Sequence, residues 1–141
     1  MKPVFAAMPL LLATLLGACA TTSQPPIGDG RPGTLVVYQP LSSNSDARLP
    51  FIYVDGYNLG RMGIGDVKTL ALAPGAHHVS LREPLLLWPG VESAATDINI
   101  SVGQTSYVRF VRKQVGVGPT GNAETLPSLN EVTADQGDAH Q

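Results

Sequence analysis

The sequence predicts an all-β protein, a small antiparallel β-sandwich of about seven to eight short strands. Two observations predict this fold. Runs of β-branched and aromatic residues alternate apolar and polar side chains with a period of two, and turn residues separate them about every 8–12 residues. Beyond residue 18, no stretch has apolar residues at the 3.6-residue spacing of a helix. The expected strands are 34–39, 51–54, 57–61, 67–72, 77–82, 97–102, 105–112 and 129–133.

Turn chemistry defines where several of these strands end. Asp55-Gly56 is a strong hairpin signal because both residues tolerate a positive φ. In Pro74-Gly75, proline fixes φ and glycine supplies the positive φ of a type II turn. Residues 116–121 are rich in glycine but lack the Gly-Lys-Ser/Thr ending that cradles phosphates, so we expect a hairpin tip there.

Residues 1–18 have the layout of an export signal. Lys2 precedes an apolar run that starts at Val4 and ends in small residues. Leu16 is too large for ordinary cleavage after Ala18. An uncleaved transmembrane helix is the alternative, but the run is shorter than the roughly 20 residues needed to cross a bilayer, and Pro9 interrupts it.

The residues that close this run, 16–19, resemble the lipobox of bacterial lipoproteins, in which a leucine and two small residues precede a cysteine. The resemblance implies that the signal peptide is cut before Cys19, and that Cys19 is acylated and anchors the chain to a membrane. A diacyl- or triacyl-cysteine is sufficient for stable anchoring. Ala20 after the cysteine, rather than Asp, implies the periplasmic face of the outer membrane in a bacterium with two membranes. Cys19 is the only cysteine, so no internal disulfide is expected.

The rest of the chain divides into three parts: a flexible linker at 19–32, a folded domain at 33–133 and a polar tail at 134–141. Proline and glycine in the linker oppose regular structure. The formal net charge is −2, from nine Lys+Arg and eleven Asp+Glu, without any run of cations. This charge pattern argues against nucleic acid as a partner.

Two segments, 53–60 and 70–79, resemble the core of PEGA-like domains. The shared pattern is a strand ending in Val-Asp-Gly, followed by Leu-x-Pro-Gly-x-His-x-Val leading into a later strand. Behind a lipobox, the pattern is similar to that of small bacterial lipoproteins whose domain has no assigned function. The resemblance implies a PEGA- or Ig-like sandwich over roughly 33–133, and it implies no activity.

The residues that could act in catalysis or metal binding are better explained by structural roles. His77 and His78 are neighbours in a strand, so they face opposite sides and cannot share a metal, and we expect neither a metal nor a cofactor. We expect His77 to be half-buried behind the Pro-Gly turn, His78 to be exposed and Asp55 to form a turn. No Gly-x-Ser-x-Gly elbow is present, and acylation of Cys19 would leave no thiol nucleophile. A catalytic Ser-His-Asp triad assembled across strands stays open. We therefore expect a non-catalytic protein.

The segment 84–90 is intensely apolar where a loop is expected. It either folds back to plug one end of the sandwich or exposes a patch that contacts a partner or a membrane. The candidate partner-binding residues are Leu85, Leu86, Leu87 and Trp88, with Trp88 as the natural anchor.

A second, weaker candidate is a cationic row that is expected to point outward. It would be a solvated face or would meet anionic lipid headgroups or a glycan strand. Its members are Arg82, Arg109, Arg112 and Lys113.

Together these features favour a lipid-anchored envelope protein whose non-catalytic domain tethers or recognises another envelope component, either protein or peptidoglycan. The tether would raise the effective concentration of the domain near such a partner. The alternative is a periplasmic inhibitor or assembly factor that acts through residues 84–90. An enzyme ranks third.

Overall fold

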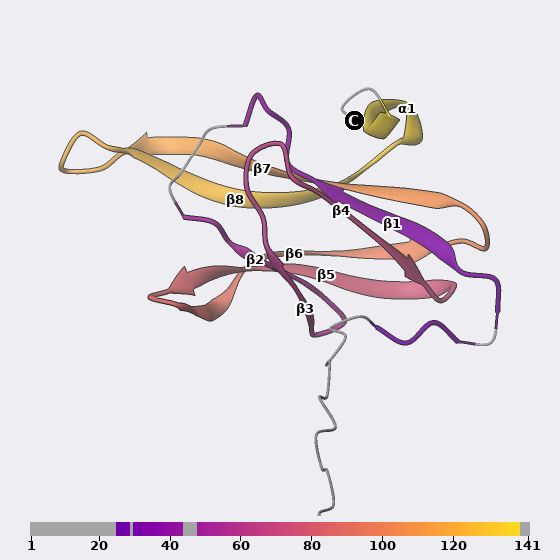
Figure 1. The fold of residues 1–141 in the computed structure, drawn as a ribbon. Helices are drawn as coiled ribbons and strands as arrows, with labels where there is room; N and C mark the ends of the chain where they lie inside the picture. Colours follow the sequence, from indigo (N-terminus) through magenta and orange to yellow (C-terminus); the bar gives the residue numbers. More distant parts are fainter. Residues whose placement is uncertain (1–24, 29, 44–47, 139–141) are drawn as a thin grey trace, which may run out of the picture.

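The computed structural model describes residues 25–28, 30–43 and 48–138 (Figure 1). Cys19 and the rest of the lipobox-like motif lie outside the described residues. Within the described residues, eight strands and one short helix follow each other along the chain. They are β1 (Gly33–Tyr38), β2 (Phe51–Val54), β3 (Tyr57–Arg61), β4 (Val67–Leu72), β5 (Gly75–Leu85), β6 (Trp88–Ile100), β7 (Thr105–Val117), β8 (Ala123–Val132) and α1 (Ala134–Asp138).

The strands form two four-stranded sheets stacked face to face, and Figure 1 shows the two layers edge-on. The first sheet has the order β4-β1-β7-β8 and the second β3-β2-β5-β6. The predicted β-sandwich is confirmed. One pairing departs from a purely antiparallel arrangement, because β1 and β7 run parallel, with Thr34 opposite Thr105 and Tyr38 opposite Arg109.

Alternate residues of both sheets meet in a single core between the layers. The predicted alternation in β5 is confirmed, since Val79 and Leu81 point inward and are fully buried. The core consists of Leu35, Val37, Ile52, Val54, Met62, Leu70, Leu72, Val79, Leu81, Ile98, Ile100, Val108, Phe110 and Leu129.

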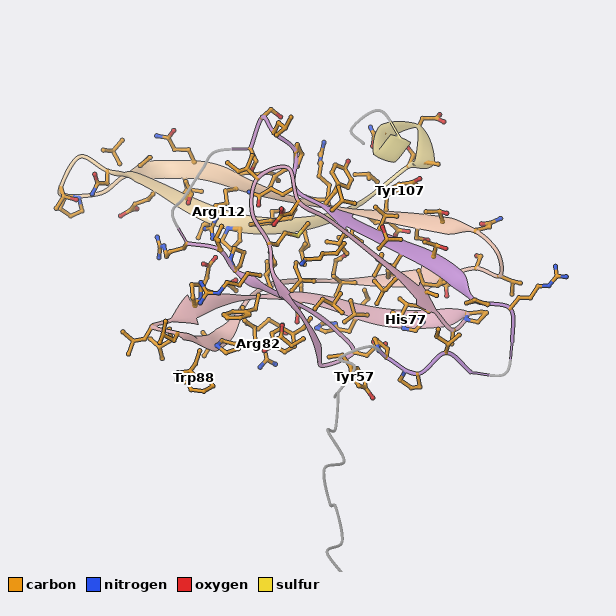
Figure 2. All side chains as sticks on the ribbon, viewed as in Figure 1. Tyr57, His77, Arg82, Trp88, Tyr107 and Arg112 are labelled. Carbon is orange, nitrogen blue, oxygen red and sulfur yellow. The ribbon has the colours of Figure 1, made fainter. Side chains whose placement is uncertain are left out.

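A smaller apolar cluster covers the outer face of the first sheet. It contains Val36, Tyr38 and Tyr107, and α1 lies over it (Figure 2). The hydroxyl of Tyr38 donates a hydrogen bond of 3.5 Å to the carbonyl oxygen of Gln136 in α1, and Gly137 packs so closely on the Tyr107 ring that a Cβ would clash with it. The sequence predicts no helix beyond residue 18, and α1 corrects that prediction, because the apolar outer face of the first sheet gives this short helix a place to dock.

Two hairpins extend beyond the core at the same end of the sandwich (Figure 1). The β7–β8 hairpin has its tip at residues 118–122, which confirms the hairpin tip expected in the glycine-rich segment. The β5–β6 hairpin turns at residues 86 and 87. The loop expected over 84–90 is thus wrong, because these residues continue the two paired strands to a tight turn.

The outward row of cations is also not observed. Arg112 is buried between the sheets, and the Arg82 guanidinium carbon lies over the Tyr53 ring, 4.5 Å from its centre. Arg82 belongs to the second sheet, whereas Arg109 and Arg112 belong to the first. Of these four residues, Lys113 is exposed, Arg82 and Arg109 are partly buried, and Arg112 is buried. The four cations therefore do not form one solvated face.

Candidate functional site: the apolar tip of the β5–β6 hairpin

The tip of the β5–β6 hairpin exposes four consecutive large apolar side chains, which we call the apolar tip. Their exposed fractions are 69% for Leu85, 89% for Leu86, 79% for Leu87 and 75% for Trp88. Figure 2 shows Trp88 at the end of the hairpin, pointing away from both sheets. The expectation that this segment plugs the sandwich is wrong, because none of the four packs in the core, and the alternative of an exposed patch is observed.

The turn at the apolar tip has an unfavourable backbone for its residues. Leu86 adopts a φ of 58°, in the left-handed region. That conformation is costly for a residue with a Cβ, and turns that need it usually contain Gly, Asn or Asp there. The β2–β3 turn follows the usual chemistry, with Asp55 at 50° and Gly56 at 81°. The tip thus holds a leucine where a more stable turn would hold glycine.

The hairpin below the tip is held by close pairing of its two strands. Leu85 pairs with Trp88 and Pro84 with Pro89. A Cβ on Gly90 would lie 2.7 Å from the carbonyl oxygen of Glu83, so a glycine is needed for the strands to approach here. The tip is therefore presented on a paired ribbon rather than on a loose loop.

The base of the hairpin is joined to the opposite sheet by an ion pair. The Nη2 atom of Arg112, on β7, donates to Oε1 of Glu83, on β5, at 2.6 Å. The Arg112 side chain is 3% exposed, and its guanidinium also lies 5.7 Å from the centre of the Phe110 ring. This contact was missed from the sequence, although Arg112 has the same parity as Val108 and Phe110 in β7, and that parity points inward.

A cleft of about 240 Å³ opens beside Arg112. The described residues that line it are Gln39, Arg48, Leu49, Met62, Gly63, Ile64 and Arg112. They include no carboxylate, imidazole, hydroxyl or thiol, so the described lining offers no group for acid–base or nucleophilic chemistry.

The two adjacent histidines lie toward the other end of the sandwich from the apolar tip, as the position of His77 in Figure 2 shows. Nδ1 of His77 is 2.6 Å from Oδ2 of Asp55, and Nε2 is 2.6 Å from the carbonyl oxygen of Ala73. The other carboxylate oxygen of Asp55 accepts a 2.9 Å hydrogen bond from the backbone N–H of His78. Asp55 therefore forms the expected turn and also ties it to β5. His77 is half-buried behind the Pro-Gly turn, as predicted.

His78 is exposed, as predicted, and its ring lies among acids on the outer face of the second sheet. Its Nδ1 is 2.6 Å from Oδ1 of Asp97, and its Nε2 is 3.5 Å from Oε2 of Glu92. The hydrogen bond to Asp97 is the main reason that the pKa of His78 is raised above its usual value, with Glu92 adding to the effect and burial opposing it. The two histidine rings have separate partners, in agreement with their opposite faces.

Among residues 25–28, 30–43 and 48–138, no group of three or more His, Cys, Asp or Glu side chains is arranged to hold a metal ion. Within the same residues, no helix has the length and apolar character needed to cross a membrane.

Fold and site together describe a two-sheet β-sandwich with an exposed apolar hairpin tip. No family model, curated protein or solved structure matches this chain.

Proposed function

We propose that this chain is a lipid-anchored envelope protein whose non-catalytic β-sandwich recognises another component of the envelope through the apolar tip. The observation that carries the proposal is the exposure of Leu85, Leu86, Leu87 and Trp88 at the end of a paired hairpin. Contiguous exposed apolar residues mark contact surfaces, because leaving them in water is unfavourable and a partner removes them from it.

The lipobox-like motif supports the proposed lipid anchor. Acylation of Cys19 would confine the sandwich to a thin layer above a membrane, where even a small contact surface meets its partner at a high effective concentration. A four-residue tip is small compared with the roughly 800 Å² that each partner buries in a stable interface, so a tether compensates for its size.

A direct test is crosslinking in intact envelopes followed by a pull-down. Wild type is compared with Trp88→Ala, with Cys19→Ser and with Val102→Ala, a matched exposed apolar residue near the β6–β7 turn at the opposite end. We expect Val102→Ala to crosslink like wild type, and Trp88→Ala and Cys19→Ser to lose the product. Equal crosslinking by all four chains would contradict the proposal. Labelling with a radioactive fatty acid tests acylation separately, since Cys19→Ser should remove the label.

The protruding shape of the tip also supports the second candidate, a periplasmic inhibitor or assembly factor that places this tip in the cleft of an enzyme. The two functions differ in the identity of the crosslinked component. Capture of one enzyme, with loss of its activity when wild type is added and no loss with Trp88→Ala, would favour the inhibitor.

A further inference from the structure

We infer that the component contacted by the apolar tip is a phospholipid bilayer, into whose interfacial region the tip inserts. The inference deepens the proposed function by naming the partner of the same tip. It rests on the distribution of apolar side chains around the hairpin, on the charges near it and on the strained turn.

Apolar side chains lie on both faces of the hairpin end and at its turn. Leu85 and Trp88 are cross-strand partners and share one face, the adjacent pair Pro84 and Pro89 shares the opposite face, and residues 86 and 87 form the turn. The four residues of the apolar tip are mostly exposed. A flat protein surface would cover one side of such a hairpin and leave the other in water, whereas a bilayer surrounds it completely.

Charge around the tip also favours a bilayer. Residues 84–91 contain no charged side chain. Below them, Glu83 is paired with Arg112, and Glu92 lies within 3.5 Å of Nε2 of His78. Arg82 remains as a partly exposed cation stacked on Tyr53. Thus the acids near the tip have cationic or ionisable partners within the fold, and the cation Arg82 lies two residues before the uncharged segment 84–91.

The dimensions of the tip match shallow insertion. Two residues on each strand reach roughly 7 Å at the rise of a β-strand. Interfacial segments bury their apolar parts about 5–10 Å deep, at the boundary between headgroups and acyl chains. Tryptophan is enriched at that boundary, since its ring is apolar and its indole N–H is polar.

The strained turn is a further, independent observation. Leu86 has a φ of 58°, which glycine would adopt at lower cost. Strain that the rest of the fold does not require is typical of functional positions. Here the strained position holds a large apolar side chain at the outermost point of the hairpin, and that side chain makes no contact with the core.

Trp88 is the only tryptophan in the sequence, so its fluorescence reports the tip directly. The acylated full-length chain is reconstituted in vesicles of phosphatidylethanolamine and phosphatidylglycerol. We expect the emission to shift to shorter wavelength and to be quenched by lipids brominated near the headgroup end of the acyl chain. Leu86→Asp should abolish both changes, and Leu86→Asn, which tolerates the turn, should weaken them. The matched control Val102→Asp should leave them unchanged, and circular dichroism checks that each variant is folded.

A second measurement removes the effect of the anchor. Vesicle sedimentation of Cys19→Ser without residues 1–18 should give a Kd that Leu86→Asp weakens at least about tenfold and that Val102→Asp does not change. Solvent-like emission with no bromolipid quenching would overturn the inference. If an envelope protein then crosslinks to the tip, the proposed recognition stands without the bilayer. If Cys19 carries no acyl chain and yet the tip inserts, the anchor fails and the inference stands.

Discussion

The guanidinium of Arg112 and the carboxylate of Glu83 lie 2.6 Å apart between the two sheets, at the base of the hairpin that carries the apolar tip. One residue comes from β7 and the other from β5, so the pair connects the two layers. Its burial makes each partner dependent on the other, because an unpaired charge in the interior is costly.

Glu83→Ala is expected to lower the free energy of unfolding by about 3 kcal/mol, since it removes the carboxylate that forms the ion pair with the buried guanidinium of Arg112. Replacing both residues, as Glu83→Leu with Arg112→Met, should recover most of that loss. Urea unfolding measures both variants. Arg61→Ala, which removes an exposed cation 4.8 Å from the Phe51 ring, should cost less than about 1 kcal/mol. An equal loss in Glu83→Ala and Arg61→Ala would contradict a special role for the pair.

Asp55→Ala is expected to destabilise the domain by about 2 kcal/mol, because it removes acceptors for the His77 ring and for the backbone N–H of His78. Asp55→Asn should lose clearly less. Its amide oxygen can still accept one hydrogen bond, and asparagine tolerates the φ of 50° at this position. Thermal unfolding compares the two variants, and identical losses would show that neither the remaining acceptor nor tolerance of the turn conformation contributes to stability.

His78 is expected to make stability depend on pH. Its pKa is raised in the folded state by Asp97 and Glu92, so the folded protein binds this proton more tightly than the unfolded chain does. The stabilisation is fully present below the unfolded value near 6.5 and is lost as the pH rises through the folded value. Urea unfolding at several pH values should show this decline in wild type and a smaller one in His78→Gln. Identical slopes would rule out the contribution of His78.

Leu86→Gly is expected to stabilise the domain by roughly 0.5 to 1 kcal/mol, because glycine adopts the φ of 58° without steric cost. Leu87→Gly is the matched control. Leu87 has no positive φ, so glycine there should only increase the entropy of the unfolded chain and reduce stability slightly. Both variants should weaken the contact made by the tip, and a Leu86→Gly protein less stable than wild type would refute strain at this turn.

The position of Arg112 illustrates how far sequence patterns could predict the site. Strand alternation gives Arg112 the inward parity of Val108 and Phe110, but the predicted outward row of cations includes it. An arginine is rarely buried without a partner. The partner, Glu83, is supplied by a strand of the opposite sheet. No local pattern contains that information.

The apolar tip also shows what the sequence could and could not predict. Its residues were evident in the sequence as a run of three leucines and a tryptophan. Whether they plug the core or face solvent depends on where the hairpin ends relative to the other sheet. Pairing of β5 with β6 continues to Leu85 and Trp88, beyond the core, and this pairing leaves them exposed.

The sequence by itself determined the sandwich class, the main turns and the presence of eight strands, because alternation and turn chemistry act between residues close in the chain. It did not determine the full lengths of β5, β6 and β8, which extend beyond the predicted ranges. Asp55-Gly56 and Pro74-Gly75 needed no distant partner to be interpreted. Only the tertiary structure decided the parallel pairing of β1 with β7, the docking of α1 on Tyr107 and the pairing of Arg112 with Glu83. Each of these brings together residues far apart in the chain, and their energies depend on burial that exists only once both sheets have met.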